Sequence, residues 1–189
     1  MSITTKHGDT GHTRLIFGQQ VGKDHPAIAA VGDADELNAV LGLARLHVKR
    51  NDLRDIIARV QEDIVGLMGV LSAGVENAAR YAAAGFRGLE QSALDSLTAE
   101  GAALEAEFPD GFRTWSVPGA SGSAGSAWLE LARTVCRRAE RSAAALSPPP
   151  DAVAVAWLNR LSDVLWLAAR CEELAARPPV FDDLRPPEC

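Results

Sequence analysis

The sequence predicts an all-α protein, an antiparallel bundle of five helices behind an irregular N-terminal arm. Apolar residues recur at three- and four-residue spacing through five segments, the alternating pattern of strands is nearly absent, and Gly- and Pro-rich stretches separate the segments. With 189 residues the chain has the size of one domain. We divide it into an arm over residues 1–30, a helical bundle over residues 31–177 and a Pro-rich tail over residues 178–189.

The predicted helices are joined by short or moderate connections. They span about residues 33–48, 53–75, 89–104, 126–146 and 152–176. Short polar residues that could cap a helix N-terminus precede three of them, namely Asp33 or Asp35, Asn51 or Asp52, and Asp151. The prolines from Pro148 to Pro150 end the fourth helix, because proline lacks the N–H that the helical ladder needs. Between Thr4 and Ala30 no helical period survives among the glycines, so we expect a loop or arm.

Composition excludes several classes of protein. A chain with 47% hydrophobic and 23% charged residues is neither disordered nor built of membrane spans. The formal net charge of -6 offers no basic field for nucleic acid. No signal-like run follows Met1, and no stretch approaches the ~18 apolar residues of a membrane helix, so we expect a cytoplasmic protein. We expect free thiols, with no zinc site and no disulfide, at Cys136, Cys171 and Cys189.

The N-terminal arm has the residue types of an anion site. Between Thr5 and Thr13, glycines alternate with hydroxyl side chains, and Lys6 supplies a positive charge. Backbone N–H groups exposed by Gly8 and Gly11 can hold phosphate oxygens. Without the Walker spacing, the same composition also fits a merely flexible terminus.

The fourth helix carries a row of arginines. Arg133, Arg137 and Arg141 follow one another at i, i+4 steps, so their guanidinium groups share one face. Such a row is most often a solvated face, but here it borders an apolar seam, where fork-shaped donors suit phosphate oxygens. The fifth helix carries a polar strip that includes Asn159 and Asp163. The chain lacks a Gly-x-Ser-x-Gly motif and a Cys/His pair, which lowers the expectation of a hydrolase.

Three separated segments together resemble the PduO-type ATP:cob(I)alamin adenosyltransferases. They extend over about residues 4–170, in the order that the family has. The segments are Thr5-Lys6-x-Gly8-Asp9-x-Gly11-x-Thr13-x-Leu15, then Gly32-Asp33-Ala34-Asp35-Glu36-Leu37-Asn38, and finally Ala132 to Arg141 with Leu158 to Asp163. Each motif alone is moderately specific, whereas the set is strong.

The resemblance implies a five-helix bundle that forms a homotrimer and binds ATP between subunits. Asp35 is then the acid that pairs with Arg133 of a neighbouring subunit, and we assign Asp35, Arg133 and Arg137 to catalysis. The residues assigned to ATP are Thr5, Lys6, Gly8, Gly11, Thr13, Lys23, Arg137, Glu140 and Asn159. The apolar side chains assigned to cobalamin are Trp115, Phe112 and Trp166.

The implied reaction is attack by cob(I)alamin on the 5′ carbon of ATP, which gives adenosylcobalamin and triphosphate, with Mg²⁺ on the phosphates. The nucleophile then belongs to the corrinoid, so the protein needs no catalytic Ser, Cys or His. An adenosylcobalamin-dependent acceptor enzyme is a further expected partner. The chain departs from the family at Trp115 and Trp166, where Phe is usual, and at Gln19 and Gln20, where basic residues are usual.

Two other interpretations stay open from the sequence. One is a non-catalytic relative that binds or delivers cobalamin or another tetrapyrrole, and the departures from the family pattern favour it. The other is a structural helical trimer. The presence of Lys6, Arg133, Arg137, Glu140 and Asn159 favours the enzyme.

Overall fold

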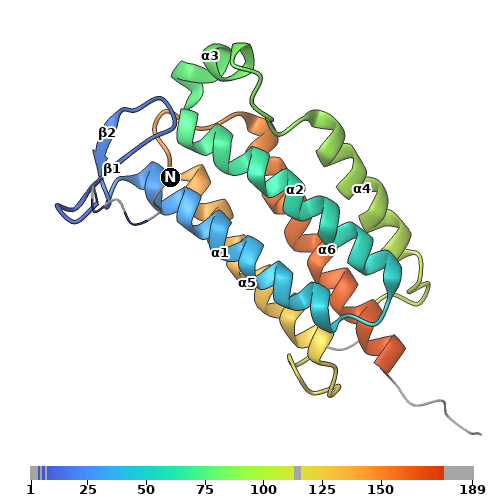
Figure 1. Ribbon diagram of the computed structural model, residues 1–189. Coiled ribbons are helices and arrows are strands. Elements are labelled where there is room, and N and C mark those ends of the chain that lie inside the picture. The colour runs from blue at the N-terminus through green and yellow to red at the C-terminus, as the bar shows by residue number, and fades with distance from the viewer. Residues whose placement is uncertain (1–3, 5, 7, 113–115, 177–189) are drawn as a thin grey trace, which may run out of the picture.

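The computed structural model describes residues 4, 6, 8–112 and 116–176 of the chain. These residues form six α-helices, one 3₁₀ turn and a two-stranded sheet (Figure 1). The helices are α1 (Pro26–His47), α2 (Asn51–Ala73), α3 (Ala78–Ala83), α4 (Gln91–Glu105), α5 (Ala124–Ala144) and α6 (Ala152–Ala176), with η1 at Val75–Asn77 and strands β1 (His12–Arg14) and β2 (Gln20–Gly22). The prediction of a mostly helical protein is confirmed, whereas the hairpin and α3 were not predicted.

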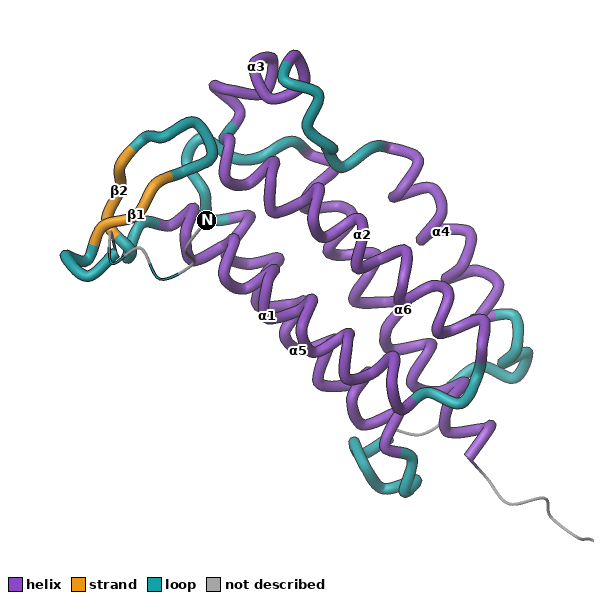
Figure 2. The backbone as a smooth tube through the Cα atoms, viewed as in Figure 1, coloured by secondary structure: helices purple, strands orange, loops and turns teal. Residues whose placement is uncertain are grey.

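The five longer helices lie side by side along one axis. α1 packs against α2 and α5, α5 packs against α6, and α6 packs against α4. Successive long helices run in opposite directions, and a long connection returns the chain from the end of α4 to the start of α5 (Figures 1 and 2). The seams between the helices hold a core of fully buried side chains, the largest of which are Trp157, Leu37, Leu41, Leu53, Ile64, Leu67, Leu97, Leu129, Leu158 and Leu161.

The first helix begins earlier than the sequence predicts. His25 is its N-cap, because its Nδ1 accepts a hydrogen bond from the backbone N–H of Ala27, and Pro26 occupies the first turn. Asp33 and Asp35 lie inside α1, so the prediction that either of them caps the helix was wrong. The first turns of α1 bury only alanines, which differ little in hydropathy from their neighbours. The helical period of apolar residues therefore becomes visible only from Leu37.

Cap predictions at the other helices had mixed outcomes. Asn51 and Asp52 lie in the first turn of α2, whose N-cap is Arg50, so the predicted caps were wrong by one or two residues. Asp151 does cap α6, since its Oδ1 accepts from the backbone N–H of Val153 at 3.0 Å. Ser123 caps α5 in the same way, with its Oγ accepting from the N–H of Ser126 at 3.2 Å.

The last helix, α6, corrects an expectation about hydropathy. By length and composition alone α6 could cross a membrane, contrary to the expectation that no segment of the chain could. However, 56% of its most apolar window is buried inside the structure. Trp157, Leu158 and Leu161 are completely buried between α5 and the neighbouring helices. The apolar character of α6 therefore follows from its place in the core.

The N-terminal arm is more regular than the sequence predicts. β1 and β2 pair antiparallel, with Thr13 opposite Val21, and Val21 is buried. The backbone N–H of Ile16, in the hairpin loop, donates to Oγ of Ser72 near the end of α2 at 3.2 Å. The arm is thus a hairpin attached to one end of the bundle, beside the start of α1 (Figure 2).

Candidate functional site

The turn before β1 folds against Lys23. A methyl group placed on Gly8 would lie 3.0 Å from Nζ of Lys23, so glycine allows the ammonium group to approach the backbone. The backbone N–H of Lys23 donates to the carbonyl of Gly11 at 2.9 Å. Both Lys6 and Gly11 have positive φ, at 58° and 78°. The turn that contains Lys6, Gly8 and Gly11 therefore lies against Lys23. Thr5 lies outside the described residues.

The arginine row on α5 divides into different environments. Nε of Arg133 donates to Oε2 of Glu130 at 2.8 Å, and Arg133 is half-buried. Nη1 of Arg137 donates to Oε2 of Glu140 at 2.6 Å, which fixes this exposed guanidinium beside a more buried carboxylate. Arg141 is exposed. The expected pairing of Arg137 and Glu140 in one site is therefore compatible with the geometry.

Asn159 on α6 lies level with this row. The thiol of Cys136 on α5 donates to the carbonyl of Leu158 on α6 at an Sγ–O distance of 3.2 Å. Arg137 and Asn159 are the next residues along their helices from this contact. Asn159 is exposed. Burial raises the pKa of the Cys136 thiol well above its ordinary value, which keeps this thiol neutral and unreactive.

An open cavity of about 480 Å³ lies between α4, α6 and the connection after α4. The rings of Phe112 and Trp166 meet edge to face on its wall, with centroids 4.4 Å apart. Phe108 extends this aromatic cluster, since its ring centroid is 4.7 Å from that of Phe112. Arg160 and Asp163 supply polar groups to the same cavity. Trp115 lies outside the described residues.

Asp35 and Arg133 do not meet within the described part of a single chain. Arg133 pairs with Glu130, and Asp35 is exposed on α1. The neighbouring acid Asp33 instead accepts from Nε of Arg138 at 3.0 Å and from Oγ of Ser142. Asp33 therefore joins α1 to α5 and is no helix cap.

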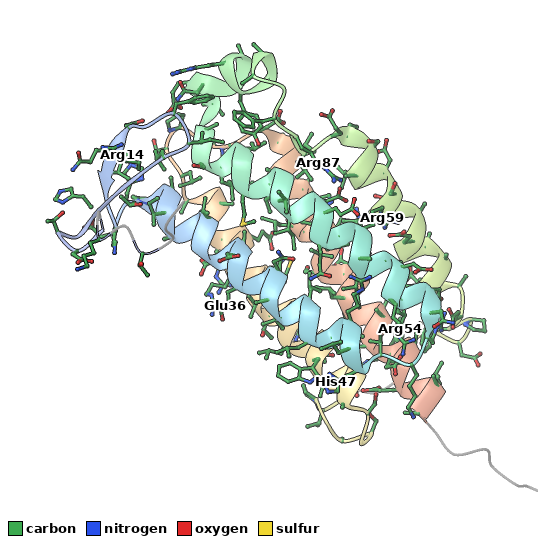
Figure 3. The ribbon with its side chains drawn as sticks, in the orientation of Figure 1. Arg14, Glu36, His47, Arg54, Arg59 and Arg87 are labelled. Atoms are coloured by element: carbon green, nitrogen blue, oxygen red, sulfur yellow. The ribbon has the colours of Figure 1, made fainter. Side chains whose placement is uncertain are left out.

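Arg138 binds a second acid of α1. Its Nη2 donates to Oε2 of Glu36. Figure 3 shows Glu36 on the side of α1 that borders α5. Because α1 begins at Pro26, Glu36 lies in the middle of this helix.

A buried ionic chain in the seam between α5 and α6 was missed from the sequence. Glu130, Arg170 and Glu173 are almost completely buried, and Arg170 binds both carboxylates. A signal for it existed: Arg170 is a charged residue inside the long apolar helix α6, and each of its partners stands three residues from an arginine.

The sequence matches the family described as cobalamin adenosyltransferase over residues 3–172. The chain belongs to this family. Among adenosyltransferases, it is 34% identical to the corrinoid adenosyltransferase PduO of Citrobacter freundii over 178 residues, which cover 92% of this chain and 50% of that relative. It is 35% identical to the corrinoid adenosyltransferase of Mycobacterium tuberculosis strain H37Rv, with 89% of this chain and 86% of the relative covered. The chain thus spans about half the length of the PduO relative.

Solved structures of the family have the same fold. A variant of the PduO-type ATP:corrinoid adenosyltransferase from Lactobacillus reuteri, complexed with cobalamin and ATP, superposes with a TM-score of 0.81 at 27% identity, covering 94% of this chain and 97% of that chain. A second variant of that adenosyltransferase, complexed with ATP, gives a TM-score of 0.77 at 26% identity, covering 91% of this chain and 94% of that chain.

Proposed function

We propose that the protein transfers the 5′-deoxyadenosyl group of ATP to cob(I)alamin and releases triphosphate. Family membership supports this proposal. The observation that carries it is the packing of α5, which bears the arginine row, on α6, which bears Arg160 and Trp166 of the cavity wall. An apolar wall for a flat ligand and a row of anion-binding groups are therefore carried by two helices that pack on each other.

The reaction needs little covalent chemistry from the protein. The electron pair of Co(I) forms the bond to C5′, and the C5′–O bond breaks with its electrons leaving on the triphosphate. Negative charge on the leaving oxygen is stabilised by fixed donors, which we assign to Lys6, Lys23 and Arg137. Holding C5′ in line with cobalt converts an encounter into an oriented step within the complex.

The nucleotide site that we propose has two sides. The arm supplies Thr5, Lys6, Gly8, Gly11, Thr13 and Lys23, and the helices supply Arg137, Glu140 and Asn159. Glu140 fixes the guanidinium of Arg137 through their 2.6 Å ion pair. Asn159 offers an exposed amide one helix away. These polar groups can hold the phosphates and the nucleoside without a metal ligand set on the protein.

We infer that the active assembly is a homotrimer of five-helix bundles, with each ATP site shared between two subunits. Asp35 is exposed, and Arg133 uses only Nε in the contacts of the described residues, so both can pair across an interface. Exposed apolar side chains on α1 and α5 also favour association, with Leu46 exposed by 77% and Leu131 by 44%. When one face of a subunit binds a different face of the next subunit, a rotation that closes gives a ring.

We assign the corrinoid to the aromatic cavity. We assign Phe112 and Trp166 to the lower face of the corrinoid, which their edge-to-face contact on the cavity wall supports. Trp115 belongs to the same connection as Phe112. An apolar wall that excludes the lower axial ligand makes cobalt easier to reduce. Trp in place of Phe keeps such a wall and adds an N–H that needs a partner.

Mg²⁺ is expected to enter with ATP. Among the described residues, no group of three or more His, Cys, Asp or Glu side chains is close enough to hold a metal ion. Phosphate oxygens and water commonly supply most ligands of Mg²⁺ in nucleotide sites, which fits this arm of lysines and glycines.

We further propose a cytoplasmic location and delivery of the product to an adenosylcobalamin-dependent enzyme. The free buried thiols Cys136 and Cys171 are compatible with a reducing compartment.

Anaerobic incubation with reduced cobalamin and Mg-ATP tests the proposal. The expected result is the visible spectrum of adenosylcobalamin, together with one triphosphate released per cofactor formed. Binding of cobalamin without the carbon–cobalt bond would favour the non-catalytic relative. Binding of neither ligand would favour a structural protein.

A further inference from the structure

The ionic chain between α5 and α6 begins at a residue that we assign to catalysis. Arg133 donates through Nε to Oε2 of Glu130 at 2.8 Å. The other oxygen of Glu130, Oε1, accepts from Nη2 of Arg170 at 2.8 Å. The same Nη2 lies 3.0 Å from Oε1 of Glu173. Charges of alternating sign therefore run from the edge of α5 into the core and on along α6.

The other end of the chain reaches the connection between α4 and α5. Both carboxylate oxygens of Glu173 accept from Oγ of Ser116, at 3.0 and 3.2 Å. Oγ of Ser126 also donates to Oε1 at 3.0 Å. Ser116 directly follows Trp115, in the connection that carries Phe112. One buried carboxylate thus fixes the backbone segment that we assign to the corrinoid.

Arg170 also contacts the wall of the cavity. Its guanidinium carbon lies 5.5 Å from the centroid of the Trp166 ring, one turn earlier on α6. Arg170 is therefore linked to Arg133 through Glu130. Through Trp166 and Glu173 it is also linked to the corrinoid side of the site, by which we mean the aromatic cavity and the connection between α4 and α5.

Stability alone does not account for this arrangement. Burying charged groups costs several kcal/mol per ion, and well-packed apolar side chains often serve a core equally well. Glu130 is 4% exposed and Arg170 is 6% exposed. Nε and Nη1 of Arg170 are buried without a hydrogen-bond partner in the described structure. Each charged side chain of the seam binds the next one directly, so a movement of Glu173 or Arg170 changes the position of Glu130.

We propose that Glu130, Arg170 and Glu173 are positioning residues that couple the corrinoid side of the site to Arg133. This inference rests on the proposed function. When the corrinoid contacts Trp166 and the connection that carries Ser116, Glu173 and Arg170 hold Glu130, and Glu130 orients the outer nitrogens of Arg133 for the nucleotide or the neighbouring subunit. By linkage, each ligand then strengthens the binding of the other by the same factor.

The test measures the dissociation constant of ATP with and without cob(II)alamin, by calorimetry. In the wild-type protein we expect cob(II)alamin to tighten ATP binding ~5–150-fold, the usual range of coupling between two sites. Ser116→Ala removes the hydroxyl donor and Glu173→Gln removes the negative charge, both without a large change in volume. In these variants the ratio of the dissociation constants of ATP without and with cob(II)alamin should fall to within ~2-fold of one. Each ligand alone should still bind.

Two matched variants make the readout specific. Ser116→Thr keeps a hydroxyl and should keep the wild-type ratio. Ser121→Ala removes a hydroxyl from the same connection, one that accepts from the N–H of Ser123 and does not touch the ionic chain, and should also keep it. A wild-type ratio in folded Ser116→Ala and Glu173→Gln, or a ratio of one in the wild type, would overturn the coupling while turnover still supports the proposed function. Failure of the wild type to bind either ligand would overturn both.

Discussion

The guanidinium carbon of Arg80 lies 4.1 Å from the centroid of the Phe17 ring. This cation–π contact connects the hairpin loop to α3. Phe17 also faces Phe86, with ring centroids 6.4 Å apart, and Phe86 stacks on Tyr81 at 5.2 Å. The hydroxyl of Tyr81 donates to the carbonyl of Arg87 at 2.7 Å. The arm assigned to ATP is therefore anchored by an aromatic cluster on the segment after α2.

Phe17→Ala should weaken ATP binding without slowing the chemical step. Loss of one aromatic contact and one cation–π contact is worth about 1–2 kcal/mol, so we expect KM for ATP to rise ~5–30-fold with kcat within ~2-fold. Steady-state kinetics measure both constants. Ile16→Ala is the control, because Ile16 binds Ser72 through its backbone N–H. An unchanged KM in Phe17→Ala would show that the cluster does not position the arm.

Arg137→Ala should lower turnover by at least ~100-fold and leave the fold intact. A fixed donor to developing negative charge contributes roughly 3 kcal/mol to a transition state. Arg141→Ala removes the next arginine of the row, which is exposed, and should stay within ~3-fold of wild type. Single-turnover rates with circular dichroism as a check on folding distinguish the two. Equal rates in both variants would remove Arg137 from the leaving-group site.

Trp166→Ala should reduce the four-coordinate form of cob(II)alamin that forms with Mg-ATP, because the cavity loses half of its edge-to-face pair. Trp166→Phe keeps an aromatic wall and should retain the signal. Electron paramagnetic resonance of the reduced complex reports the coordination number. The same comparison at Trp115 and Phe112 identifies which ring lies under cobalt. If the alanine variants at all three positions keep the four-coordinate signal, the corrinoid does not occupy this cavity.

Gly125→Ala should destabilise the protein by about 1–3 kcal/mol through overpacking. A methyl group at Gly125 would lie 2.9 Å from Cα of Val48 and 3.0 Å from the carbonyl of His47, and backbone atoms cannot turn away. Gly101→Ala is the matched control in α4, since its nearest neighbour would be Cγ2 of Val164 at an ordinary 3.5 Å. We expect the control to be neutral or to stabilise by up to about 1 kcal/mol. Urea unfolding measures both, and equal stability of the two variants would contradict the contact.

Glu107 should contribute to stability above pH 4.5 and lose that contribution in acid. Two hydrogen bonds from Arg50, at 2.7 and 2.8 Å, lower the pKa of Glu107 below its ordinary value of 4.5. The unfolded chain therefore takes up the proton first, and stability falls as the pH drops from about 4.5 through the lowered pKa. Glu107→Gln should show a shallower fall of the melting temperature over this range. Glu105→Gln controls for the loss of one surface charge, and an identical slope in Glu107→Gln and wild type would refute the assignment.

The sequence predicts the long helices well because each buries one continuous stripe of apolar side chains. It fails where few residues decide the structure. The strands have three residues each and α3 has six, too few for a period to be visible. The start of α1 is hidden by alanines such as Ala27 and Ala30.

The candidate site is predictable as a set of residue types, and less so as a set of contacts. The family motifs indicate Lys6, Arg137 and Asn159, and the structure shows how Arg137 is held by Glu140. The pairing of Arg170 with Glu130 depends on how α6 packs on α5, which no local pattern encodes. A contact between Asp35 and Arg133 would require a second chain, so neither the sequence nor a single protomer displays it.

The position of α6 also bears on how the protein is made. α6 is the last described helix to be synthesised, yet it packs on both α4 and α5 and supplies Trp157 to the centre of the core. Until its residues emerge from the ribosome, the faces of α4 and α5 that pack on α6 have no partner. The nascent chain therefore keeps these apolar faces exposed, and prone to aggregation, until the final helix completes the core.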